Sequence, residues 1–279
     1  MPSRIKIVFT DLDRTLLKDN GELSSPNHAA LLLLEKKGII RVLVTGRSLF
    51  SLRRAVTADF PVDYVIFSTG IGIMNWQTGE LIREHHLEES TVQRVLRILK
   101  SHQADFMIQR ILPDNHYFLY YHNGFSNDDF ERRICLYQDY AAPLDETTAI
   151  GPASQLLAVM PSEEVHRFHA LKKELNFVRV VRTTSPLDHN SVWVEIFPEE
   201  VSKGLAAAWL TEKLNLEQSQ TVSIGNDYND LEMLQWTAKS FVVGNAPGDL
   251  LRDFRVVADN NEDGFSSMIY ILQQEGWIS

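Results

Sequence analysis

Residues 5–15 read IKIVFTDLDRT, and this stretch decides the fold. Residues 5–10 form a short apolar run, which is typical of a buried strand, and the polar residues after it end the strand. Asp11 and Asp13 follow directly, two residues apart. Ligands of an open parallel sheet bind outside the carboxyl ends of its strands, so this ending predicts a functional site at the tip of the strand.

Strands and helices alternate regularly after this first strand. Ser25 and Pro26 suit an N-cap and a first helical position, and Gly38 suits a helix end. The β-α-β-α-β order is that of a parallel sheet with right-handed crossovers. We predict strands over residues 5–10, 41–45 and 64–68, and helices over residues 29–37 and 48–57.

The alternation stops after Gly70 and returns at Lys203. The segment between them mixes strands and helices, with a hairpin expected around residues 78–79. The sequence therefore predicts one α/β sheet that is split by an inserted α+β domain of roughly 110 residues. Within the insertion we predict helices over 89–102, 128–140 and 162–175, and strands over 105–109, 117–121, 155–160, 178–182 and 192–197. After it we predict helices over 203–215, 230–236, 248–253 and from 265, and strands over 221–224, 241–243 and 256–258.

Length and composition exclude several classes of protein. The chain of 279 residues suffices for one large domain or for two modest ones of about 150 residues. Hydrophobic residues make up 44% and charged residues 23%, which excludes wholesale disorder, a collagen-like chain and a disulfide-stapled miniprotein. The net charge of −10 and the lack of a basic run argue against nucleic acid as a partner.

Cysteine content and hydropathy bear on redox chemistry and location. Cys135 is the only cysteine, so an internal disulfide and a multi-cysteine zinc site are excluded, and its apolar neighbours predict that it is buried. The first residues lack the apolar region of a signal peptide, and no uncharged apolar stretch of about 18 residues occurs. We therefore expect a cytoplasmic protein without a membrane partner.

Further polar segments stand beside other predicted strands. Thr-Gly-Arg (45–47) ends the second strand, GNDYND (225–230) ends a later one, and Lys203 opens the helix after the insertion. Each alone could form a turn or cap a helix, but together they favour one site. Carboxylates crowded in a cleft repel one another unless a cation lies between them, and Mg²⁺ prefers oxygen ligands and leaves positions for a phosphate oxygen. The cluster predicts phosphate chemistry, with hydroxyls such as that of Thr15 and the charge of Lys203 as anion-binding groups.

The segments DLDRT, TGR, SKG and GNDYND resemble, in this order, the four motifs of the haloacid dehalogenase superfamily. The flanking phrases VWVEIFPEEVSKG and VGNAP resemble its Cof-type and sucrose-phosphatase-like branch, which carries a large cap between the second and third motifs. The resemblance implies a Rossmann-like parallel-sheet core over residues 1–82 and 190–279. It also implies an inserted α+β cap domain over residues 83–189 that determines substrate specificity.

The resemblance implies catalytic roles for four residues. Asp11 would attack phosphorus and form an aspartyl-phosphate, and Asp13 would act first as acid and then as base. Thr45 and Lys203 would bind the transferring phosphoryl oxygens, and Lys203 would also restrain Asp11.

The resemblance implies a metal site and a substrate site as well. Mg²⁺ would bind the carboxylate of Asp11 and the backbone carbonyl of Asp13. The candidate metal ligands and supporting residues are Asp11, Asp13, Asn226, Asp227 and Asp230. The candidate substrate-binding residues are Thr45, Gly46, Arg47, Lys203 and Asn229. For Arg47, pairing with an acidic residue of the core is the favoured alternative.

Three positions depart from the family pattern. Arg14 stands where glycine is usual, and its side chain could touch the substrate or point to solvent. Asn226 stands where the fourth motif commonly has Asp, so either Asn226 or Asp227 could ligate the metal. Residues 68–72, STGIG, resemble the sucrose-phosphatase variant, which favours a sugar substrate.

The sequence thus predicts a phosphatase of the haloacid dehalogenase type. It would be a Mg²⁺-dependent hydrolase of phosphate monoesters that acts through an aspartyl-phosphate on a small phosphorylated substrate, above all a sugar phosphate. Two alternatives stay open: a phosphomutase, and a catalytically inactive sugar-phosphate-binding regulatory protein, which the departures at Asn226 and Arg14 would suit. Both a monomer and a homodimer are compatible with the sequence.

Overall fold

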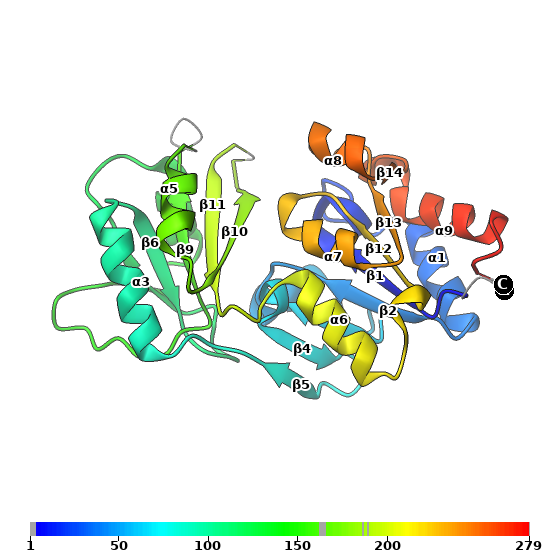
Figure 1. Cartoon of the computed structure of the whole chain (residues 1–279), viewed down its shortest axis with the longest axis horizontal. Helices are drawn as coiled ribbons and strands as arrows, with labels where there is room; N and C mark the ends of the chain where they lie inside the picture. The colour runs from blue at the N-terminus through cyan, green and yellow to red at the C-terminus, as the bar shows by residue number, and fades with distance from the viewer. Residues whose placement is uncertain (1–3, 162–165, 186, 189, 279) are drawn as a thin grey trace. The chain divides into compact units, whose positions relative to one another are not determined.

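The computed structural model describes residues 4–161, 166–185, 187–188 and 190–278. The chain divides into two compact units: the larger comprises Met1–Arg83 and Ser202–Ser279, and the smaller comprises Glu84–Val201. Each unit is built around its own sheet (Figure 1).

The larger unit contains the mostly parallel sheet that the sequence predicts. From edge to edge its strands are β14 (Arg255–Val256), β13 (Lys239–Val242), β12 (Thr221–Gly225), β1 (Ile7–Asp11), β2 (Ile40–Val44), β3 (Tyr64–Phe67), β4 (Gly72–Asn75) and β5 (Leu81–Glu84). β1 lies between its parallel partners β12 and β2, and every residue of β1 is buried. A strand buried on both faces of a parallel sheet needs a continuous apolar run, which explains the composition of residues 5–10. β4 pairs antiparallel with β3.

Helices cover the sheet of the larger unit. α6 (Lys203–Lys213) and α7 (Leu231–Trp236) pack on the face formed by alternate residues of β1 and β2. α1 (Ser25–Lys36) and α9 (Gly264–Gln274) pack against each other (Figure 1). The remaining helices are α2 (Leu49–Ala55) and α8 (Gly248–Asp253). The core under α6 and α7 consists of Ile7, Phe9, Val42, Val44, Ile66, Ile73, Ala206, Ala207, Leu210 and Met233.

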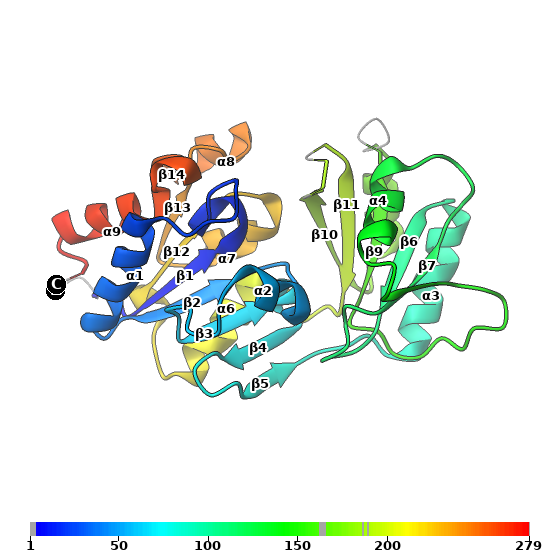
Figure 2. The ribbon, with the colours of Figure 1, turned by 180° about the vertical axis from the view of Figure 1, so that it is seen from behind.

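The smaller unit contains a second sheet. Its strands, in order, are β10 (Arg179–Thr184), β11 (Val192–Phe197), β9 (Gln155–Met160), β6 (Asp105–Gln109), β7 (Phe118–Tyr121) and β8 (Ala141–Pro143). α3 (Glu89–Ser101) and α5 (His166–Glu174) pack on one face (Figure 1), and α4 (Asp128–Leu136) packs on the other (Figure 2). The expected domain boundary at residue 190 is wrong, because β11 pairs antiparallel with β9 and β10 and therefore belongs to this unit.

Local details also differ from the sequence expectations. Ser24, one residue before the predicted cap, accepts a backbone N–H at the start of α1. Cys135, expected to be buried, is exposed, because α4 packs on the sheet through Phe130 on another side of the helix. Residues 162–165 of the helix predicted over 162–175 lie outside the described residues, and α5 begins at His166. Among the described helices, none combines the length and the apolar character needed to cross a membrane.

Candidate active site

The candidate active site lies at the carboxyl end of β1. Asp11 is the last residue of this strand and is only 5% exposed. The chain then turns sharply through Leu12–Leu16, where Asp13 is extended (φ −74°, ψ 125°) and Arg14 is left-handed (φ 55°, ψ 25°). Because β2 and β12 run parallel to β1, the segments that follow all three strands emerge at the same edge of the sheet.

A buried lysine joins the segments that follow β1 and β12. Lys203 Nζ donates to Asp11 Oδ1 and to Asp230 Oδ1, each at 2.7 Å, and the residue is 0% exposed. It is the first residue of α6, where the helix dipole disfavours a cation, so the two carboxylates hold the charge there. Burial acts to lower the pKa of Lys203, but the charges of Asp11 and Asp230 outweigh it and raise that pKa above its ordinary value.

The surroundings of Asp11 disfavour its ionised form. The pKa of Asp11 is raised to about 7, mainly because the carboxyl is buried and also because Asp230 and Asp13 repel a further negative charge. Lys203 opposes these effects without cancelling them. The chemistry of the site therefore suits an additional cation beside Asp11.

Two glycines let the charged groups approach one another. A Cβ on Gly204 would lie 2.7 Å from the backbone carbonyl carbon of Glu232, so only glycine lets α6 pack this closely on α7 beside Lys203. A Cβ on Gly225 would lie 2.5 Å from Cγ of Asp230, so only glycine leaves room for that carboxyl at the end of β12. The glycines of SKG and GNDYND thus serve the packing of the charged residues next to them.

Asp230 organises the loop that follows β12. Its Oδ2 accepts the backbone N–H groups of Asn226 at 2.9 Å and of Asp227 at 3.2 Å, while its Oδ1 accepts from Lys203. Both carboxylate oxygens are therefore engaged, and the residue is fully buried. Asp230 is placed to support the loop that carries Asn226 and Asp227, both of which are half-buried.

Arg47 holds the side chain of Asp13. Nη2 of Arg47 donates to Asp13 Oδ1 at 2.6 Å, and Nε donates to Asp13 Oδ2 at 2.7 Å. Two parallel contacts of this kind form a bidentate pair, which fixes the relative geometry of the two groups. In the structure, Arg47 thus pairs with an acidic residue of the core, as the sequence favoured.

The segment after β2 brings a hydroxyl and an amide to the same edge. Thr45 is buried, and its Oγ1 accepts the backbone N–H of Arg47 at 3.1 Å, so its own hydrogen is available for an anion. A Cβ on Gly46 would lie 3.7 Å from Asn229 Nδ2 and 3.6 Å from Thr69 Oγ1. The structure therefore brings Gly46 and Asn229 together, although they are far apart in the sequence.

A strained turn supports this segment, and sequence reasoning misses it. Ser68 and Thr69 both adopt left-handed conformations, with φ of 48° and 58°, which residues with a Cβ rarely do. The N–H of Thr69 donates to the carbonyl of Thr45 at 3.0 Å, and the N–H of Ser68 donates to the carbonyl of Arg47 at 2.8 Å. The turn thus fixes the backbone on which Thr45 and Arg47 stand. The glycines at 70 and 72 are the only sequence signal near it.

The donor set suits a hard cation more than a soft one. Within the part of the chain that the structure describes, no group of three or more His, Cys, Asp or Glu side chains is placed to hold a metal ion. Both carboxylate oxygens of Asp13 accept from Arg47, and both of Asp230 accept from Lys203 or from backbone N–H groups. Lys203, in contrast, donates to Oδ1 of Asp11. The candidate donors at this edge are then the carboxylate of Asp11, the backbone carbonyl of Asp13, and the side chains of Asn226 and Asp227. A site with few carboxylates and several other oxygens is the kind that Mg²⁺ occupies.

Arg14 faces the surface. Its Nε donates to Asp19 Oδ1 at 3.4 Å, its side chain is 42% exposed, and its carbonyl accepts from Asn245 Nδ2 at 2.9 Å. The left-handed backbone at this position is one that glycine adopts readily and arginine does not. Of the two orientations that the sequence left open, the structure shows the solvent-facing one.

We expect Arg14→Gly to raise the free energy of unfolding by up to about 1 kcal/mol. A residue with a Cβ loses about 1–2 kcal/mol of stability in the left-handed conformation. Glycine avoids this strain, but it gives the unfolded chain more conformational entropy, which cancels part of the gain. The exposed pair with Asp19 contributes little. Calorimetry would show the gain as a higher midpoint of thermal unfolding. The control Arg14→Ala keeps the strain and should show no gain; a lower midpoint for the glycine variant would contradict this account.

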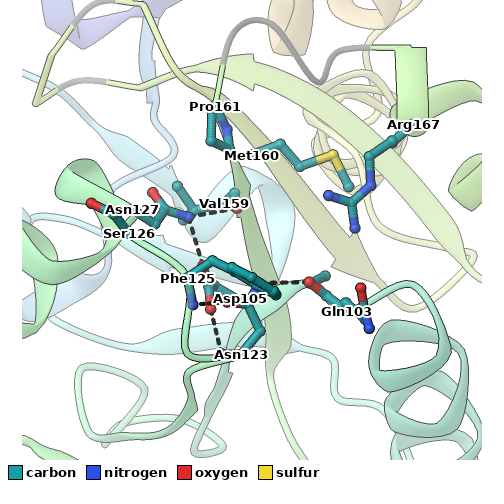
Figure 3. A pocket seen from close by; sticks show the side chains of 11 residues that line it. Gln103, Asp105, Asn123, Phe125, Ser126, Asn127, Val159, Met160, Pro161 and Arg167 are labelled. Carbon is teal, nitrogen blue, oxygen red and sulfur yellow. Dashed lines mark hydrogen bonds between the residues drawn. The ribbon is translucent and has the colours of Figure 1, made fainter.

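The smaller unit contains a separate pocket of about 240 Å³ (Figure 3). Asp105 lies in its wall and is buried, with Oδ1 accepting the N–H of Asn123 at 2.7 Å and Oδ2 accepting from Asn127 Nδ2 at 2.8 Å. The side chain of Arg167 points toward the same pocket (Figure 3). None of the sequence-predicted site residues lines it.

The chain matches the haloacid dehalogenase-like hydrolase family over residues 8–269, a span that includes all four segments described above. It is 23% identical over 277 residues to the 5-amino-6-(5-phospho-D-ribitylamino)uracil phosphatase YcsE of Bacillus subtilis strain 168, covering 95% of this chain and 94% of that protein. It is 24% identical over 249 residues to the HMP-PP phosphatase of Citrobacter koseri, covering 89% and 87%.

A solved structure shows the same fold. The HAD subclass IIB sugar phosphatase BT4131 superposes with a TM-score of 0.75 at 17% sequence identity, covering 98% of this chain and 100% of that one. At this level of identity the likeness concerns the fold, and both units of the present chain take part in it.

Proposed function

The chain belongs to the haloacid dehalogenase-like hydrolase family and is a phosphatase, and from this premise we propose that it hydrolyses phosphate monoesters through a covalent phosphate on Asp11 with the help of Mg²⁺. One observation carries the proposal. A buried lysine, Lys203, holds the carboxylates of Asp11 and Asp230 at 2.7 Å each, at the carboxyl edge of a parallel sheet. This arrangement restrains a carboxylate and places a cation beside it, which is what attack on a phosphate ester needs.

Asp11 acts as the nucleophile in this proposal. A bond forms between its carboxylate oxygen and phosphorus while the bond from phosphorus to the ester oxygen breaks. Lys203 keeps one oxygen of Asp11 in place and brings positive charge to the transferring group. The hydroxyl of Thr45 donates to a phosphoryl oxygen, and the turn at Gly46 with the neighbouring amide of Asn229 contributes further contacts to the substrate.

Asp13 acts as the acid and the base. In the first step it gives a proton to the departing alkoxide, and the alcohol leaves. In the second step it takes a proton from the water that attacks phosphorus and releases phosphate from Asp11. Asp13 lies two residues after the nucleophile, on the turn that follows β1, which suits a group that must reach the oxygen leaving phosphorus.

Mg²⁺ fits the oxygen donors of this site. Asp11 would hold it through its carboxylate, Asp13 through its backbone carbonyl, and Asn226 or Asp227 through a side-chain oxygen, while Asp230 keeps the loop of the last two in place. When bound, the ion supplies positive charge that offsets the repulsion between a carboxylate and a phosphate. The raised pKa of Asp11 supports this assignment, because burial, together with the repulsion from Asp230 and Asp13, disfavours the ionised carboxylate despite Lys203, and a bound cation would stabilise it.

The affinity for Mg²⁺ should depend on pH through Asp11. Without metal the pKa of Asp11 is raised to about 7, so below that pH the carboxyl is mostly protonated and Mg²⁺ must displace the proton. We expect the apparent affinity to rise by up to roughly tenfold per pH unit below about pH 7 and to level off above it. Titration calorimetry at about pH 6, 7 and 8, in buffers of different ionisation enthalpy, would measure both the affinity and the proton released. An affinity that does not change over this range would contradict the assignment of Asp11 as a ligand.

We propose that the substrate is a sugar phosphate and that the smaller unit, as the expected cap, selects it. The fold shared with a sugar phosphatase and the STGIG segment at residues 68–72 support this assignment. The test measures phosphate release from a panel of sugar, nucleotide and cofactor phosphates with Mg²⁺. At least one sugar phosphate should exceed p-nitrophenyl phosphate in kcat/KM by about tenfold or more. A panel in which nucleotides or cofactor phosphates rank first would contradict the sugar assignment and leave the phosphatase assignment intact.

A further inference from the structure

The ion pair between Arg47 and Asp13 takes no part in the mechanism described so far. We infer that Arg47 is a positioning residue, which holds the carboxyl of Asp13 in the orientation from which it protonates the leaving oxygen. The inference rests on the proposed function, because it concerns the acid of that reaction.

Asp13 needs such a holder because of where it stands. Its side chain is 45% exposed, on an extended residue that precedes the left-handed Arg14. Among the described residues, the hydrogen bonds to its carboxylate come from Arg47 alone. A half-exposed carboxyl on a turn would otherwise populate several rotamers, whereas a general acid must stay within hydrogen-bond reach of the departing oxygen.

Arg47 is itself fixed by three contacts. Its backbone N–H donates to Thr45 Oγ1 at 3.1 Å, and its carbonyl accepts the N–H of Ser68 at 2.8 Å. Its guanidinium also donates from Nη1 to Ser51 Oγ at 3.3 Å. Because these contacts hold Arg47 in place, its planar guanidinium in turn fixes the orientation of the Asp13 carboxylate.

A leaving-group series separates this role from direct binding of the substrate by Arg47. The ratio kcat/KM reports the steps up to the first departure of the alcohol, so hydrolysis of the intermediate does not enter it. An alkyl phosphate, such as a sugar phosphate, needs its leaving oxygen protonated, whereas p-nitrophenyl phosphate has a stable leaving group and needs little help. Loss of a positioned acid must therefore slow the alkyl ester far more than the aryl ester.

The decisive variants are Arg47→Met and Arg47→Lys. We expect Arg47→Met to lower kcat/KM for the alkyl ester by roughly 10- to 100-fold more than for p-nitrophenyl phosphate. Arg47→Lys should keep most of this selective loss, because one ammonium cannot make two parallel contacts with a carboxylate. In an Asp13→Asn background, Arg47→Met should add less than about twofold to the loss, since the group it positions is already disabled. Arg53→Met, an exposed position on α2, the helix that follows Arg47, controls for the lost charge.

Several outcomes would overturn the inference. Equal losses on both esters with a raised KM would make Arg47 a phosphate-binding residue. If Arg47→Lys retained the wild-type kcat/KM for the alkyl ester, the charge of Arg47 alone would matter. If Arg47→Met lowered kcat/KM as much in the Asp13→Asn background as in the wild type, Arg47 would not act through Asp13. The midpoint of thermal unfolding of the variants should match that of the wild type, because Arg47 and Asp13 are both partly exposed. If Arg47→Met fails to fold, the Arg47→Lys variant decides the question. A wild type that releases no phosphate from any ester would instead refute the proposed function itself, and this inference with it.

Discussion

Asp11→Asn should abolish phosphate release, with a loss in kcat of roughly 10⁴-fold or more. The substitution preserves the shape of the side chain and removes the charged oxygen that bonds to phosphorus. Asp11 ends the central strand of the sheet, where Lys203 restrains it at 2.7 Å. The measurement is release of inorganic phosphate from the preferred ester at saturating Mg²⁺.

The Asp11→Asn variant should remain folded. The raised pKa of Asp11 means that the fold disfavours its ionised form without metal, so a neutral amide in its place costs little stability, and Lys203 keeps Asp230 as a partner. The matched control is Asp59→Asn, an exposed carboxylate that should leave activity unchanged. Activity within a factor of about ten of the wild type would show that another residue attacks phosphorus.

Lys203→Met should lower the free energy of unfolding by about 3–5 kcal/mol and also abolish activity. Lys203 is 0% exposed and is the cation between two buried carboxylates, so its loss leaves Asp11 and Asp230 uncompensated in a region shielded from water. Chemical denaturation near neutral pH would measure the loss. Because protonation of Asp11, whose pKa is already raised by burial, relieves its repulsion with Asp230, the deficit should shrink as the pH falls.

A second substitution tests the reason for this instability. Lys203→Met combined with Asp230→Asn removes one of the two uncompensated charges and should recover part of the stability without recovering activity. Lys213→Met, at the exposed end of the same helix, is the control and should be close to neutral. If Lys203→Met unfolds at the same denaturant concentration as the wild type, the buried pairing does not hold the site together.

Much of the fold follows from the sequence because its strands are buried on both faces. An apolar run such as residues 5–10 fits only the middle of a covered parallel sheet, and its polar ending then points to the functional edge. On this basis the sequence predicts one site that contains Asp11, Lys203 and Asp230, although Asp11 and Asp230 are 219 positions apart in the chain. The glycines at 204 and 225 acquire a physical reason only from the distances in the structure.

The rest depends on tertiary contacts that local patterns do not carry. The strand at Val192–Phe197 looks the same in either unit, and only its pairing with β9 and β10 assigns it to the smaller one. The strained turn at Ser68 and Thr69 contradicts the preferences of both residues, so propensity cannot predict it. The bond between Arg47 and Asp13 joins positions 34 residues apart and fixes which side-chain oxygens are engaged, a detail that spacing alone leaves open.

The central claim is that phosphate passes through a covalent bond to Asp11. The most direct test mixes the enzyme with Mg²⁺ and a radiolabelled phosphate ester, quenches the reaction in acid within one turnover, and maps the label on the digested protein. The account predicts label on the peptide that contains Asp11, sensitive to hydroxylamine as an acyl phosphate is, and absent from Asp11→Asn. Label on another residue, or none at all while the wild type turns over the ester, would contradict it.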